Sequence, residues 1–96
     1  MARYRIMYWK HIPQSFVVEG DVHTVKKQLS QRIQNAIDAY AMAAGLTSTS
    51  DYAREFKRGD WIERAGSPEE VAEALLSELE AEFAKIEIPN RNGNGA

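Results

Sequence analysis

The 96-residue chain contains no cysteine. This absence excludes disulfide bonds, thiol nucleophiles, cysteine-ligated zinc and iron–sulfur clusters. Long apolar runs are also missing: none approaches the ~20 residues that a membrane span needs, and the N-terminus lacks the apolar segment of a signal peptide. We therefore expect a soluble cytoplasmic protein without a membrane segment.

The chain is too short for two hydrophobic cores, because domains typically need ~100–150 residues each. Hydrophobic residues make up 44% and charged residues 27%, which is typical of a globular protein. The final residues are rich in glycine and asparagine and have nothing to bury. We expect one domain over residues 1–88 and a flexible tail over residues 89–96.

Charge is unevenly distributed along the chain, although the net charge is only −2. Residues 1–33 hold six basic and two acidic residues, whereas residues 34–96 hold six basic and twelve acidic ones. The small net charge argues against bulk electrostatic binding to nucleic acid. The asymmetry can orient a partner or a second copy of the chain, or it can be ordinary surface chemistry.

Three segments have the alternation and the β-favouring residues of strands. The first, residues 3–9, places two sets of side chains on opposite faces: Tyr4, Ile6 and Tyr8 on one, and Arg5, Met7 and Trp9 on the other. Residues 15–29 indicate a hairpin that turns at Gly20. Residues 61–64 indicate a short further strand, which follows a turn at Gly59 and Asp60.

The remaining patterns predict two main helices and one short helix. Ser30 is a candidate N-cap for a helix that ends at Gly45. Ser50 could cap a short helix that reaches Phe56. Ser67, Pro68 and Glu70 form a complete capping signal for a helix that runs to about residue 87. The order predicts an α+β fold: a three- to four-stranded antiparallel or mixed sheet with two main helices packed on one face.

Four segments carry a resemblance to a known pattern: residues 4–13, YRIMYWKHIP; 25–29, VKKQL; 37–46, IDAYAMAAGL; and 66–72, GSPEEVA. The chain resembles a bacterial family usually labelled only "virulence factor". Similar domains lie at the C-terminal end of conserved virulence factor C proteins, behind a NifU-like domain and HEAT-type repeats. The chain departs from the family pattern at His11, where an acidic residue is expected, and at Ser30, where proline is usual.

The resemblance covers roughly residues 3–80 and implies little about chemistry, because the family has no established activity. Relatives are associated with corrinoid and methyltetrahydrofolate methyltransferase genes. The resemblance therefore implies that such proteins are candidate partners.

No catalytic constellation is visible in the sequence. The two histidines, His11 and His23, lie in separate turns, and no third metal ligand accompanies them at a typical spacing. The serines occupy caps and loops, where serine is favoured for backbone hydrogen bonding. We expect a non-enzymatic protein with no catalytic residues, no metal and no cofactor.

The most informative feature is the predicted sheet face opposite the helices. Tryptophan, methionine and arginine are enriched in interface hot spots, and an uncovered face that carries them is a candidate binding surface. The predicted contact residues are the following: Arg5, Met7, Trp9, Lys10, Lys27 and Trp61. The alternative is that the short helix around residues 51–57 covers this face and that Trp9 is a core residue.

The sequence leaves three functions open. The first is a protein-interaction or accessory module whose partner is another protein or a second copy in a homodimer. The second is a small subunit or ligand-binding partner of a corrinoid or methyltetrahydrofolate methyltransferase system. The third is an RNA-binding module that stacks bases on Tyr8 and Trp9 beside Lys26 and Lys27, although the acidic chain makes nucleic acid the weaker candidate.

Overall fold

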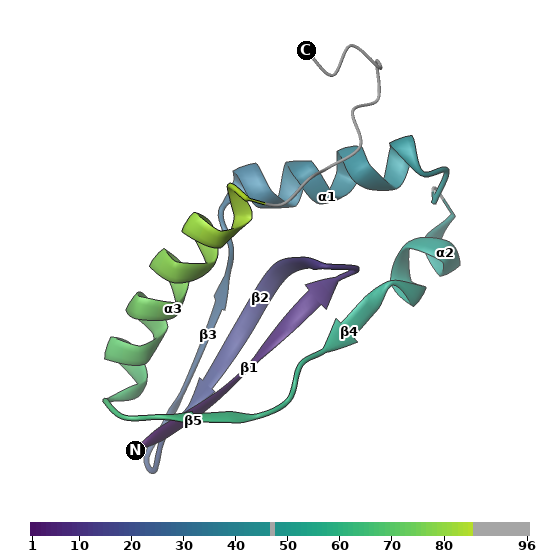
Figure 1. The fold of residues 1–96 in the computed structure, drawn as a ribbon. Helices are drawn as coiled ribbons and strands as arrows, with labels where there is room; N and C mark the ends of the chain where they lie inside the picture. The colour runs from purple at the N-terminus through teal and green to yellow at the C-terminus, as the bar shows by residue number, and fades with distance from the viewer. Residues whose placement is uncertain (47, 86–96) are drawn as a thin grey trace.

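The computed structural model describes residues 1–46 and 48–85, which form five strands and three helices (Figure 1). The elements follow in this order: β1 (Ala2–Trp9), β2 (Ile12–Glu19), β3 (Thr24–Gln28), α1 (Gln31–Ala43), α2 (Thr49–Arg54), β4 (Phe56–Arg58), β5 (Ile62–Arg64) and α3 (Pro68–Phe83). This architecture confirms the α+β class that the sequence predicts.

The five strands form one antiparallel sheet with β1 at its centre. The order is β3-β2-β1-β4, and β5 also pairs with β1. The sheet has one strand more than the sequence indicated, because Phe56 does not close the short helix. It opens β4 instead, where it lies opposite Trp9.

A bulge separates β4 from β5 and sets the direction of Trp61. Met7 pairs with Arg58 and Tyr4 pairs with Ile62, so three steps along β1 correspond to four steps along its partner. Side chains alternate strictly in a regular strand, so Arg58 and Trp61 would point to opposite faces without the extra residue. The extra residue brings both to the same face of the sheet.

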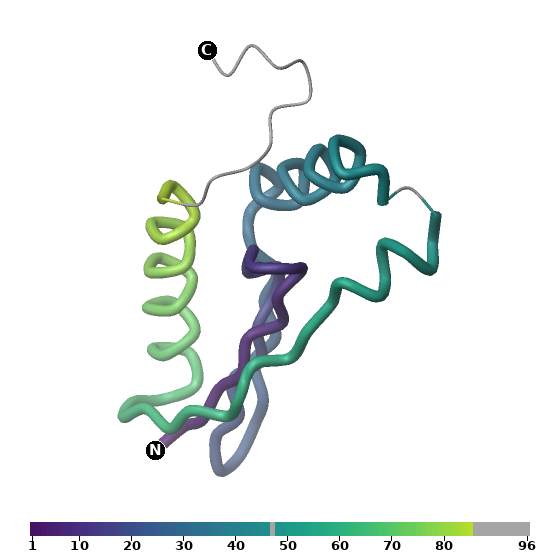
Figure 2. Tube along the Cα trace, turned by 45° about the vertical axis from the view of Figure 1, so that its right-hand side comes forward, coloured from purple at the N-terminus to yellow at the C-terminus, as the bar shows by residue number. Residues whose placement is uncertain are grey.

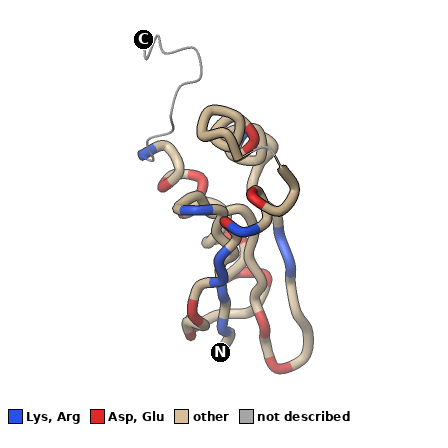
Figure 3. The backbone as a smooth tube through the Cα atoms, turned by 90° about the vertical axis from the view of Figure 1, so that its right-hand side faces the viewer, with Lys and Arg blue, Asp and Glu red and all other residues tan. Residues whose placement is uncertain are grey.

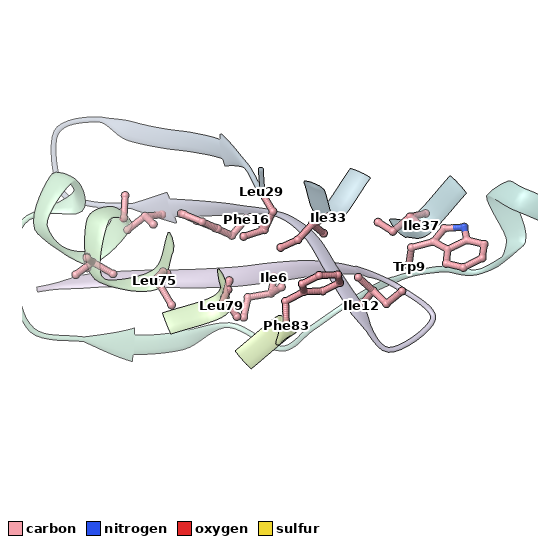
Figure 4. Close-up of a cluster of buried hydrophobic side chains, with 14 of the residues drawn as sticks. Ile6, Trp9, Ile12, Phe16, Leu29, Ile33, Ile37, Leu75, Leu79 and Phe83 are labelled. Carbon is pink, nitrogen blue, oxygen red and sulfur yellow. The ribbon is translucent and has the colours of Figure 1, made fainter. Parts of the chain in front are cut away.

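The main helices cover one face of the sheet (Figures 1 and 2). α3 packs along β1, β2 and β3, and α1 packs mainly on β2. The buried apolar side chains between helices and sheet form one continuous cluster, part of which is drawn in Figure 4. Phe16 and Val18 of β2 and Ile33 and Ile37 of α1 are almost completely buried in it.

Helix α3 begins as the sequence predicts. Ser67 Oγ accepts a hydrogen bond from the Glu70 amide at 3.2 Å, and Glu70 Oε1 accepts one from the Ser67 amide at 3.0 Å. These reciprocal bonds satisfy two amides that the first helical turn leaves without partners. The helix ends at Phe83 and not near residue 87, and the predicted tail over residues 89–96 lies outside the described residues.

The two other helices use different caps from those predicted. Ser30 precedes α1, but its side chain does not cap the helix. Its amide and its hydroxyl both donate to the carboxylate of Glu80 on α3, at 2.7 and 2.9 Å. In α2 the cap is Ser48, whose hydroxyl accepts from the Asp51 amide at 3.1 Å, while Ser50 lies inside the helix.

None of the helices in the described parts of the chain has the length and apolar character that crossing a membrane requires.

Candidate functional site: the open face of the sheet

The sheet face opposite α1 and α3 holds a shallow groove of about 490 Å³. All the strands except β5 contribute to it, together with Trp61 from the bulge. Its lining residues are Arg5, Met7, Ser15, Phe16, Val17, Glu19, Lys26, Lys27, Gln28, Arg58 and Trp61. The groove therefore crosses the sheet from β3 to β4.

Strand register explains why these residues share one face. Met7 lies opposite Ser15 on one side and Arg58 on the other. In the next row Arg5 lies opposite Val17, and Val17 lies opposite Lys26. Directly opposed residues in a sheet point to the same face, so each row forms a strip across the groove. The floor combines apolar side chains with cationic ones.

Trp61 forms one wall of the groove and lies beneath two arginines. The guanidinium carbons of Arg3 and Arg5 are 4.3 and 4.8 Å from its ring centroid, within the range of cation–π attraction. Arg5 Nε also donates to the Gly59 carbonyl at 3.3 Å. These contacts orient the indole over the groove and hold Arg5 beside it.

Gly59 allows the bulge to lie close to β1. Its amide donates to the Ile6 carbonyl at 2.7 Å, and a Cβ at this position would lie only 3.2 Å from that oxygen. A side chain here would push the bulge away from β1. The glycine thus supports the position of Trp61, two residues further along the chain.

The groove carries an excess of positive charge. Four of its lining residues are basic and only Glu19 is acidic. Glu19 already pairs with Arg3, at 2.8 Å. Across residues 1–46 and 48–85, no ion pair involves Arg5, Lys26, Lys27 or Arg58. Figure 3 shows the charged positions along the backbone, with basic positions on β1, β3 and β4.

The structure places Arg5 and Met7 in the groove on the open face and adds Trp61, whose burial the sequence left open, but it corrects the position of Trp9. Trp9 is completely buried. Its ring lies 5.5 Å from that of Tyr40 and 5.3 Å from that of Tyr52, and its Nε1 donates to the Tyr52 carbonyl at 2.9 Å. The alternative from the sequence is correct here, because Tyr52 belongs to the short helix α2.

Alternation along β1 does not predict the burial of Trp9, because distant elements enclose it. Trp9 keeps the regular register of β1 against β4, but Tyr40 of α1 and Tyr52 of α2 pack on its ring. A pattern that describes an isolated strand cannot include such neighbours.

Lys10 and Lys27 also differ from the prediction. Lys10 lies in the turn after β1, where its Nζ is 3.2 Å from Glu55 Oε1 and 5.8 Å from the centre of the Tyr40 ring. It does not line the groove. Lys27 is a lining residue, but it lies opposite the buried Phe16, so its side chain leaves β3 on the helix-covered side.

Sequence reasoning missed several lining residues, of which Arg58 is the most important. Arg58 lies between the predicted short helix and the predicted turn at Gly59, and it forms part of β4. Lysine and arginine before a glycine do not favour a strand, so the local sequence carries little signal for β4. Ser15 and Val17 follow from the alternation with the buried Phe16 and Val18, once the buried face is known.

The two histidines lie apart, in contact with different partners. The His11 ring is 5.7 Å from that of Tyr40, and the His23 ring contacts the Glu69 carboxylate. The hydrogen bond from His23 lowers the pKa of Glu69. Among the described residues no three histidine, aspartate or glutamate side chains are arranged to hold a metal ion.

Comparison with protein families gives one result. Residues 7–90 match the family described as Virulence factor. The chain belongs to this family. The matched region of this virulence factor domain includes Met7, Arg58 and Trp61 of the groove but begins after Arg5. Neither the curated proteins nor the solved structures provided a significant match.

Proposed function

We propose that this virulence factor family domain is a non-catalytic protein-interaction module that binds its partner on the open face of the sheet. One observation carries the proposal. The groove combines Met7 and Trp61 with basic side chains that have no ion-pair partner in the described chain. Apolar anchors surrounded by charged groups are typical of a protein interface.

Two details of the groove favour a protein partner over RNA. Trp9, one of the two side chains expected to stack on bases, is buried, and Tyr8 does not line the groove. Phe16 is buried, and the partly exposed aromatic residue of the groove, Trp61, is already in contact with the guanidinium groups of Arg3 and Arg5. Base stacking on this face would have to displace them.

The association with corrinoid or methyltetrahydrofolate methyltransferase proteins stays a prediction from the family resemblance. Such a protein is one candidate for the partner that occupies the groove.

A site-specific crosslink tests the proposal in living cells. A photo-reactive benzoylphenylalanine in place of Met7 should give a discrete protein adduct after irradiation. The same group in place of Val22, which is 91% exposed in the turn after β2 and outside the groove, should not give it. The adduct is then identified by mass spectrometry.

A matched pair of charge reversals controls the experiment. Arg58 and Lys57 are neighbours on β4, but only Arg58 lines the groove. Arg58→Glu should abolish the adduct at position 7 and Lys57→Glu should retain it, with both variants folded by circular dichroism. The same adducts from positions 7 and 22, or an adduct that persists in Arg58→Glu, would overturn the proposal.

A further inference from the structure

Strand β3 forms one edge of the sheet, and side chains of this strand line the groove. Among the described residues it pairs only with β2, and four of its five residues are exposed. An edge strand presents backbone amides and carbonyls that another strand can pair with. Natural edges of this kind are usually protected or used for binding.

The outward backbone groups of β3 can be identified from its register. The Leu29 amide donates to the directly opposed Gln14 carbonyl at 3.0 Å. At the other end of the hairpin, the Gly20 amide donates to the His23 carbonyl at 3.0 Å. Hydrogen-bonded and non-hydrogen-bonded pairs alternate along an antiparallel ladder. Within β3, Val25 and Lys27 therefore bond to β2, whereas the residues that face outward are Thr24, Lys26 and Gln28.

By this alternation the backbone groups of these three residues point away from β2, and outside the strand ladders they make no backbone hydrogen bond with the described residues. Two of them also line the groove with their side chains, Lys26 and Gln28. Lys26 and Gln28 therefore have outward backbone groups at the edge of the sheet. On the open face they place an ammonium group and a side-chain amide. A strand that pairs with β3 would lay alternate side chains along the groove.

We propose that the partner contributes an extended acidic segment that adds to the sheet as a sixth strand at the edge of β3. This inference rests on the proposed function and names the chemistry of its partner. Residues opposite Lys26 on the added strand share its face, at the 4.5–5.5 Å Cβ separation of directly opposed pairs. A carboxylate there meets a lysine that has no ion-pair partner in the described chain.

The charge at the edge also disfavours a second copy as the occupant. Antiparallel pairing of two β3 edges over their full length places Lys26 of one copy opposite Lys26 of the other. Like charges directly opposed across a sheet are destabilising, and lysine on an edge strand is a common protection against self-pairing. We therefore expect the isolated protein to be a monomer in light scattering.

A peptide binding experiment tests the strand addition. The probe is a fluorescein-labelled octapeptide of alternating glutamate and valine, and binding to the full chain is followed by fluorescence anisotropy at low salt. A peptide of the same composition, with its glutamates and valines in separate blocks, is the control for charge alone. The alternating peptide should bind at least about tenfold more tightly than the block peptide.

Two further peptides separate backbone pairing from side-chain attraction. N-methylation of every second amide, made in both phases, blocks one hydrogen-bonding edge of the probe but keeps its charges. One phase should lose binding by about tenfold or more and the other should lose much less, because only one edge pairs with β3. Lys26→Glu should abolish binding, whereas Lys57→Glu should change it less than about twofold.

The outcomes separate this inference from the proposed function. Equal binding of both N-methylated peptides would overturn strand addition, even where the crosslink at position 7 persists. Failure of the alternating peptide to bind, together with a persistent crosslink, would overturn the acidic strand as the partner segment. Absence of the crosslink would overturn the proposed function itself. A dimer in light scattering that Lys26→Glu dissociates would identify a second copy as the occupant.

Discussion

At the scale of single residues, the two tryptophans illustrate how position decides a side chain's role. Trp9 is completely buried between α1 and α2 and donates to a backbone carbonyl. Trp61 lies at the groove, partly exposed, under two arginines. Burial of an indole contributes strongly to stability, whereas an exposed indole on a surface contributes mainly to binding.

This difference predicts that alanine at position 9 mainly lowers stability, whereas alanine at position 61 mainly lowers binding. Trp9→Ala should lower the free energy of unfolding by about 3–5 kcal/mol, because it leaves a cavity in the core and removes the hydrogen bond to the Tyr52 carbonyl. Trp61→Ala should cost about 1 kcal/mol or less and should remove the crosslink at position 7. Urea denaturation, followed by circular dichroism, measures both. Equal destabilisation by the two variants would contradict the assignment of Trp61 to a surface role.

At the scale of elements, Glu80 joins the two main helices. It accepts from the amide and hydroxyl of Ser30 at the start of α1, and Arg32 approaches it at 3.2 Å. Proline, the residue that the resemblance leads us to expect at position 30, has no amide hydrogen to donate. The contact between α1 and α3 therefore depends on serine at this position.

The contacts of Glu80 predict how stability depends on pH. Burial raises its pKa, but the hydrogen bonds from Ser30 and Arg32 outweigh this effect, so the pKa lies below its usual value of 4.5. A carboxylate with a lowered pKa stabilises the fold fully above its unfolded pKa, and this contribution is lost as the pH falls through the folded pKa. Glu80→Gln should lower stability at neutral pH by about 1–2 kcal/mol and lose less on acidification than the unchanged chain.

Denaturation in urea at several pH values between about 7 and 3 measures this effect. Glu73→Gln is the matched control, because Glu73 is exposed on the same helix and forms no ion pair with the described residues. The control should follow the unchanged chain. An identical pH dependence in Glu80→Gln and in the unchanged chain would show that the contact does not contribute.

At the scale of the whole molecule, the sheet has a protected centre and one exposed edge. β1 pairs with β2 on one side and with β4 and β5 on the other, and α3 lies over it. Within residues 1–46 and 48–85, β3 pairs on one side only. Opening of the sheet from the β3 edge requires the loss of one ladder, whereas exposure of β1 requires the loss of most of the fold.

Amide hydrogen exchange, followed by NMR, should reveal this gradient. The slowest amides should belong to β1, and within β3 the amides should alternate: Val25 and Lys27 slow, Lys26 and Gln28 fast. Addition of the alternating acidic peptide should slow the Lys26 and Gln28 amides selectively. Uniform exchange along β3 in the free protein would contradict the assignment of its outward groups.

Patterns over short stretches of sequence were sufficient to predict the α+β fold class, the two main helices and most of β1–β3. Binary alternation and caps such as Ser67 with Glu70 act within a few residues, so they can be recognised without a fold. Alternation along β1 also placed Arg5 and Met7 on the open face, but it placed Trp9 there too, and the sequence left open whether Trp61 is buried or exposed.

Only the tertiary structure decided what surrounds each of these residues. The burial of Trp9 depends on Tyr40 and Tyr52, which lie far along the chain, and the role of Ser30 depends on Glu80 in another helix. Arg58 joins the groove because a bulge at Gly59 pairs both β4 and β5 with one strand. Sequence alone determined which residues are charged and which are apolar. Long-range strand pairing determined which of them share one face of the sheet. Local periodicity could not predict this, because it does not encode contacts between distant segments.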